Sequence, residues 1–120
     1  MREGLDAFEK RTKSFAVATI RLGMTLERVP GIRFVCNQLV RAAGSVAANH
    51  RAMRRARSDR EFAAKLQIVN EEVDEAVLWL EIVDEICHDL RAQNAPVLSE
   101  GLQLRAMFAR ARATTRQNLG

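Results

Sequence analysis

The feature that most constrains this chain is a row of apolar residues that recurs at alternating steps of four and three between Phe62 and Leu90. This spacing places every member of the row on one face of an α-helix. The row consists of Phe62, Leu66, Val69, Val73, Ala76, Leu80, Val83, Cys87 and Leu90. It predicts a helix of about 30 residues, roughly 45 Å long at 1.5 Å per residue, whose apolar face other helices must cover.

Three other segments show the same helical spacing, and each is bounded by residues that stop a helix. Pro30-Gly31 ends the first, Ser58 with Glu61 forms a capping box before the third, and Asn94 with Pro96 opens the last. The predicted helices span approximately residues 5–29, 32–57, 59–91 and 95–117. Connections this short make consecutive helices antiparallel.

The composition agrees with helices and disagrees with a sheet. Aromatic residues make up only 5% of the chain, Tyr is absent, and Gly and Pro together number eight. A chain of 120 residues is long enough for one self-sufficient core. The sequence therefore predicts an all-α protein, with residues 1–120 forming a single antiparallel up-down four-helix bundle.

Catalytic and cofactor motifs are absent from the sequence. Cys36 and Cys87 lie in apolar segments without nearby metal-ligand partners, so we interpret both as reduced core residues. Glu85 and His88 form one Glu-x-x-His pair, whereas a di-metal bundle site needs two such pairs. No glycine-rich phosphate loop occurs. We therefore expect no enzyme activity, no metal and no cofactor.

The N-terminal segment is charged from residue 1 to residue 13, unlike a secretory signal, and no apolar run approaches about 18 residues. These features predict a cytoplasmic protein that does not span a membrane.

Positive charge is concentrated where the second predicted helix passes into the third. The net charge is +4, and residues 51–60 contain five arginines, namely Arg51, Arg54, Arg55, Arg57 and Arg60. Guanidinium groups bind phosphates bidentately, so this cluster is a candidate RNA- or DNA-binding site that would read backbone charge. The alternative is a solvated charged surface. Of the 19 cations in the chain 16 are Arg, and codon composition can cause such a share as well as phosphate recognition.

The third predicted helix has more apolar residues than one seam of a bundle requires. Trp79, Ile82 and Ile86 form a second stripe outside the main row. An exposed stripe of this kind is typical of an interface, and we interpret it as the site of self-association. The alternative is that the fourth helix covers the stripe within the same bundle.

One polar residue, Asn49, falls in the inner row between Val46 and Met53. We predict that it is a buried polar core residue that sets the register between helices.

Two segments carry a resemblance to a known family. Residues 38–49 contain Gln38, Arg41, Ala42, Ala43, Ser45 and Asn49, and residues 58–62 follow with Ser58, Glu61 and Phe62. With Glu75 and Leu80, this pattern resembles the four-helix bundle proteins encoded in intervening sequences of bacterial large-subunit ribosomal RNA genes. It is also similar to the accessory proteins of diversity-generating retroelements.

The resemblance implies a cytoplasmic, non-catalytic homo-oligomer, arranged as a homopentamer, with a nucleic acid or a reverse transcriptase as partner. This chain departs from the family pattern after Asn49, where His50-Arg51-Ala52-Met53 replaces the usual Ile-Ala-Glu-Gly, and it lacks the Trp of the first helix. The leading hypothesis is therefore an oligomeric binding or scaffold protein for RNA or DNA. The alternative is a structural oligomer that binds a protein such as a reverse transcriptase.

Overall fold

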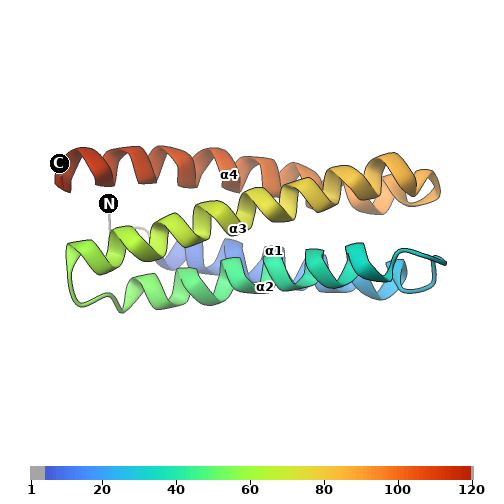
Figure 1. Cartoon of the computed structure of the whole chain (residues 1–120), viewed down its shortest axis with the longest axis horizontal. Coiled ribbons are helices and arrows are strands. Elements are labelled where there is room, and N and C mark those ends of the chain that lie inside the picture. The colour runs from blue at the N-terminus through green and yellow to red at the C-terminus, as the bar shows by residue number, and fades with distance from the viewer. Residues whose placement is uncertain (1–4, 120) are drawn as a thin grey trace.

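Each of the four predicted apolar rows lies on a helix in the computed structural model, which describes residues 5–119. These are α1 (Leu5–Leu26), α2 (Arg33–Arg54), α3 (Asp59–Ile86) and α4 (Arg91–Leu119), with a short 3-10 helix, η1 (His88–Leu90), before α4. Consecutive helices run antiparallel and side by side in a rod of 47 × 22 × 20 Å (Figure 1). No strand occurs among the described residues, which confirms the predicted all-α bundle.

The first two predicted breaks lie where helices end and begin. After α1, Gly31 adopts a φ of +83°, a conformation that favours glycine. Before α3, the Ser58 Oγ accepts a hydrogen bond of 3.0 Å from the Glu61 backbone N–H. The Glu61 carboxylate in turn accepts from the Arg57 N–H at 3.3 Å, so the capping residues stop α2 and start α3 within a few residues.

The third break differs from the prediction. Helix α3 ends at Ile86 and α4 already begins at Arg91, so Pro96 is the sixth residue of α4. This position lies beyond the first four N–H groups of the helix, which lack a partner in any case, so the proline removes one intrahelical hydrogen bond. Asn94 does not cap α4: its side chain is buried, and its Nδ2 donates to the Leu80 carbonyl of α3 at 3.0 Å. The asparagine thus ties α4 to α3.

The core is built on the inner row of α3. From Phe62 to Cys87 every residue of that row is buried, and Leu90 is half-buried. Gly101 lets α4 approach closely, because a Cβ at this position would lie 3.2 Å from Val77 Cγ2 and 3.4 Å from Phe15 Cε1. The small residue therefore sets the spacing between α4 and its two neighbours.

The buried polar residue of α2 is His50, and the prediction that Asn49 occupies this position is wrong. Asn49 is half-buried, and its Nδ2 donates to the Ser45 carbonyl and hydroxyl, both at 2.9 Å. With 3.6 residues per turn, the third and fourth residues after Val46 both lie near the core-facing side. The helix continues through His50 to Met53, and Asn49 falls at the edge of the core.

His50 packs against two phenylalanine rings from the neighbouring helices. Its ring centroid lies 6.3 Å from that of Phe8 and 5.7 Å from that of Phe108. The side chain is 0% exposed, and neither ring nitrogen has a hydrogen-bond partner among residues 5–119. Burial lowers the pKa of His50; the nearby Glu9 carboxylate opposes this shift, and the Arg54 guanidinium adds to it.

This burial predicts a loss of stability on mild acidification. In an unfolded chain the pKa of a histidine side chain is about 6.5. The pKa of His50 is lower than this in the folded protein, so the unfolded state binds the proton more readily. The free energy of unfolding should therefore fall as the pH drops below about 6.5.

Urea denaturation at a series of pH values between 7.5 and 5 measures this dependence. His50→Leu should remove the slope in this range, because it removes the buried imidazole. Parallel curves for the wild type and His50→Leu would contradict the assignment.

Candidate functional site

The antiparallel arrangement brings the basic segments of the chain to one end of the rod. The connection between α2 and α3 lies at the same end as the C-terminus of α4 (Figure 1). The five predicted arginines belong to this connection and to the helix ends beside it. Residues 101–119 of α4 contain no acidic residue and four arginines, of which Arg105 contacts Asp74 and the other three lie nearer the C-terminus. We call the following set the basic end: Arg51, Arg54, Arg55, Arg57, Arg60, Arg110, Arg112 and Arg116.

Two of the five predicted arginines face acidic residues of α1. The Arg51 Nε lies 3.6 Å from Glu9 Oε1, and the Arg54 Nη1 donates to Glu9 Oε2 at 2.8 Å. Arg54 also forms an ion pair with Asp6. These carboxylates offset part of the charge on α2. Sequence reasoning missed Glu9, because only the packing of α1 against α2 brings residues so distant along the chain together.

The other three arginines of the predicted cluster are exposed and make no ion pair with α1 among the described residues. Arg57 is 3.8 Å from Glu61 but its side chain remains 91% exposed. Arg55 and Arg60 are exposed and have no acidic partner among the described residues. Arg55 also lines an open depression of about 350 Å³ together with Glu9, Arg51 and Arg54. Three members of the cluster thus have an acidic partner, whereas Arg55 and Arg60 have none among the described residues.

Several residues of the resemblance pattern make contacts within the bundle. Arg41 of α2 pairs with Glu72 of α3 at 3.2 Å and also with Glu75. Asn49 and Ser45 bond to each other along α2. These contacts give the pattern a structural role: they join α2 to α3 and occupy polar groups at the edge of the core.

The apolar stripe predicted on α3 remains on the surface of the chain. Ile86 is 60% exposed, so the alternative in which α4 covers the stripe fails at this residue. Trp79 and Ile82 are half-buried. The Trp79 Nε1 donates to Glu75 Oε2 at 3.2 Å, and its ring meets Phe34 of α2 edge-on at 5.7 Å.

Two more exposed apolar residues extend this stripe: Phe34 is 65% exposed and Leu78 is 49% exposed. We call Phe34, Leu78, Trp79, Ile82 and Ile86 the α3 face. Sequence reasoning missed Phe34, because it belongs to a different helix.

A second apolar surface lies on α1. Val17, Ile20 and Met24 are exposed and follow each other at steps of three and four, so they form one stripe along the helix. We call it the α1 face. Helices α1 and α3 lie diagonally across the bundle, since each packs against α2 and α4 but not against the other. The α1 face and the α3 face therefore belong to different sides of the molecule.

The groups considered for chemistry lie apart from one another. Burial raises the pKa of both Cys36 and Cys87, and the Cys36 thiol donates to the Gly23 carbonyl at 3.4 Å. Glu85 and His88 are both exposed. Within residues 5–119, no group of three or more His, Cys, Asp or Glu side chains is placed to hold a metal ion. Nor is any helix of this range long and apolar enough to cross a membrane.

Comparison with known proteins supports the fold. Neither a protein-family model nor a curated protein matches this sequence. Among solved structures, the chain is similar to a protein of unknown function of the S23 ribosomal protein family from Bacteroides thetaiotaomicron. The identity is 23%, the match covers 87% of this chain and 96% of that one, and the TM-score is 0.79. The likeness shows a shared four-helix fold.

Proposed function

We propose that this protein is a non-catalytic, self-associating bundle whose basic end binds the phosphate backbone of RNA or DNA. The observation that carries the proposal is the convergence of two basic segments, distant in sequence, at one end of the rod (Figure 1). Arginines gathered on one surface neutralise phosphates and release their counterions on binding. The family name of the structurally similar protein refers to a ribosomal protein, and the ribosome is rich in RNA.

The chemistry of this end favours binding without base recognition. The aromatic residues near this end offer little stacking surface to a base, because Phe62 and Phe108 are buried and Phe8 is half-buried. Contacts from guanidinium groups to phosphates carry no sequence information by themselves. The proposed binding therefore depends strongly on salt and weakly on sequence.

A charge-matched pair of variants tests this binding. Replacing Arg55, Arg57 and Arg60 with Gln should weaken binding of a single-stranded RNA at low salt. It should also reduce the slope of log affinity against log salt by about 2, at about 0.7 per lost phosphate contact. Replacing Arg21, Arg28 and Arg33 with Gln changes the net charge equally at other positions and should have a much smaller effect. Fluorescence anisotropy measures both.

A second test should strengthen RNA binding instead of weakening it, because it removes the acidic partner that α1 provides for two arginines. Glu9→Gln removes the carboxylate that contacts Arg51 and Arg54, so it should tighten RNA binding by freeing Arg51 and leaving Arg54 paired with Asp6 alone. The proposal is abandoned if the wild type binds neither RNA nor DNA at low salt, or if the two triple variants weaken binding equally.

Self-association is the second part of the proposal, and the two apolar faces support it. We propose that the α3 face of one copy packs against the α1 face of the next. Two different faces on one chain make a head-to-tail contact, which closes into a ring when the rotation between copies allows. Glu81, Glu85 and Asp89 near the α3 face have no ion-pair partner among the described residues and would orient a basic neighbour. The resemblance implies five copies.

Light scattering at several concentrations tests this arrangement. Phe34→Lys with Ile86→Lys, on the α3 face, should give monomers, and so should Ile20→Lys with Met24→Lys on the α1 face. All four residues are exposed, so the folded subunit should tolerate the changes. Ala95→Lys with Ala106→Lys adds the same charge on α4 and should leave the oligomer intact.

Mixing the two monomeric variants gives the sharpest outcome. Each keeps one intact face, so a head-to-tail arrangement predicts that the mixture forms dimers and nothing larger. An oligomer that survives in the α1-face variant would contradict the head-to-tail contact. A monomeric wild type would overturn self-association, and the exposed α3 face would then favour the alternative function, binding of a protein such as a reverse transcriptase.

A further inference from the structure

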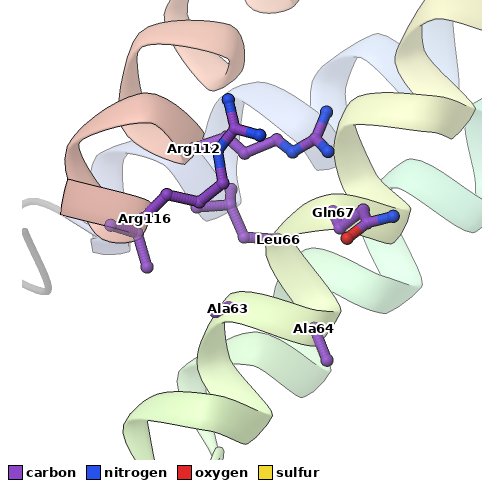
Figure 2. A pocket seen from close by; sticks show the side chains of 7 residues that line it. Ala63, Ala64, Leu66, Gln67, Arg112 and Arg116 are labelled. Carbon is purple, nitrogen blue, oxygen red and sulfur yellow. The ribbon is translucent and has the colours of Figure 1, made fainter. Parts of the chain in front are cut away.

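A small cavity lies between the first turns of α3 and the last turns of α4 (Figure 2). Its volume is about 110 Å³, several times the volume of about 30 Å³ that a water molecule occupies in the liquid. The apolar part of its wall consists of Ala63, Ala64 and Leu66 of α3. The polar part consists of Gln67, Arg112, Thr115 and Arg116. The cavity can therefore hold a small polyatomic group that meets cations on one side.

Thr115 is the most informative of these residues. It is only 7% exposed, and its Oγ1 has no hydrogen-bond partner among the described residues. The two other buried threonines bond back to their own helix: the Thr12 Oγ1 donates to the Glu9 carbonyl at 3.1 Å, and the Thr19 Oγ1 to the Phe15 carbonyl at 2.8 Å. A buried hydroxyl without a partner is costly, and an acceptor bound in the cavity that Thr115 lines would supply one.

The two arginines of the cavity also lack a counter-charge. Arg112 and Arg116 are one helical turn apart, and both side chains line the cavity (Figure 2). Like charges at this spacing destabilise a helix. Neither has an acidic partner within residues 5–119, whereas Arg105 of the same helix contacts Asp74 at 3.1 Å. A bound anion would supply the missing negative charge.

We infer that this cavity is a binding site for a phosphate group. A phosphate accepts bidentate hydrogen bonds from guanidinium groups, and its remaining oxygens can accept from the Thr115 hydroxyl and the Gln67 amide. The apolar wall excludes water from one side of the ion and so strengthens these charged contacts. The site lies outside the predicted arginine cluster of residues 51–60, but its Arg112 and Arg116 belong to the basic end. The inference therefore deepens the proposed function by placing one phosphate in a defined cavity, and its test with inorganic phosphate does not require that the protein bind RNA.

Titration of the purified protein with inorganic phosphate tests the site directly. We expect one phosphate per chain by calorimetry. Thr115→Val should weaken this binding by about tenfold, because it removes one hydrogen bond to a charged group. Arg112→Gln should weaken it by about tenfold or more. Thr115→Val should leave the melting temperature unchanged or raise it, since the hydroxyl is unpartnered in the free protein.

Two matched controls separate the site from general effects. Arg33→Gln removes the same charge from an exposed position outside the basic end, and it should keep wild-type phosphate affinity. Thr12→Val removes a buried hydroxyl that already has a partner, so it should lower the melting temperature without changing phosphate binding. Absence of phosphate binding at millimolar concentration would overturn the inference. Equal binding by wild type, Thr115→Val and Arg112→Gln would overturn it as well.

A second arm distinguishes a free phosphate from a phosphate of a polynucleotide. If Arg112→Gln and Thr115→Val weaken both inorganic phosphate and single-stranded RNA, the cavity holds a backbone or terminal phosphate of the RNA. If they weaken inorganic phosphate alone, the ligand is a free phosphate or a small phosphorylated molecule. Both results support the site. The second result is also expected for a protein that binds phosphate in this cavity but binds no RNA.

Discussion

Burial of the apolar row on α3 is the constraint on which the rest of the molecule depends. This helix packs against α2 along one side and α4 along another, and its inner row is almost completely removed from water. Polar groups at the edges of the core then set the register. Arg41 of α2 reaches carboxylates of α3, while Asn94 of α4 reaches a carbonyl of α3. The other helices are thus positioned relative to α3.

The same packing places charge and apolar surface where a partner can meet them. Antiparallel helices return the C-terminus of α4 to the α2–α3 connection, so arginines separated by about half of the chain share one end. The α3 and α1 faces lie on different sides, because these helices are diagonal in the bundle. Binding and self-association would therefore occupy different surfaces, with the candidate phosphate cavity a further feature of the basic end.

The helical architecture was predictable from sequence, because apolar spacing and capping residues act locally. Finer features depended on contacts between distant segments. The choice between Asn49 and His50 depends on a fraction of a helical turn. Pro96 lies inside α4 although a proline in the second turn removes an intrahelical hydrogen bond, so the contacts of α4 with α3 outweigh this local signal. The pairing of Arg54 with Glu9, and the cavity at Thr115, required the register between whole helices, which no local pattern encodes.

The order in which the helices touch also bears on how the chain reaches this structure. Each helix packs mainly against its neighbour in sequence, whereas α1 and α4 meet over a smaller region around Phe15 and Gly101. Most of the core can therefore form through successive helical hairpins with short loops to close. Such a topology favours rapid folding. The contact between α1 and α4 is the exception, because it closes nearly the whole chain into a loop.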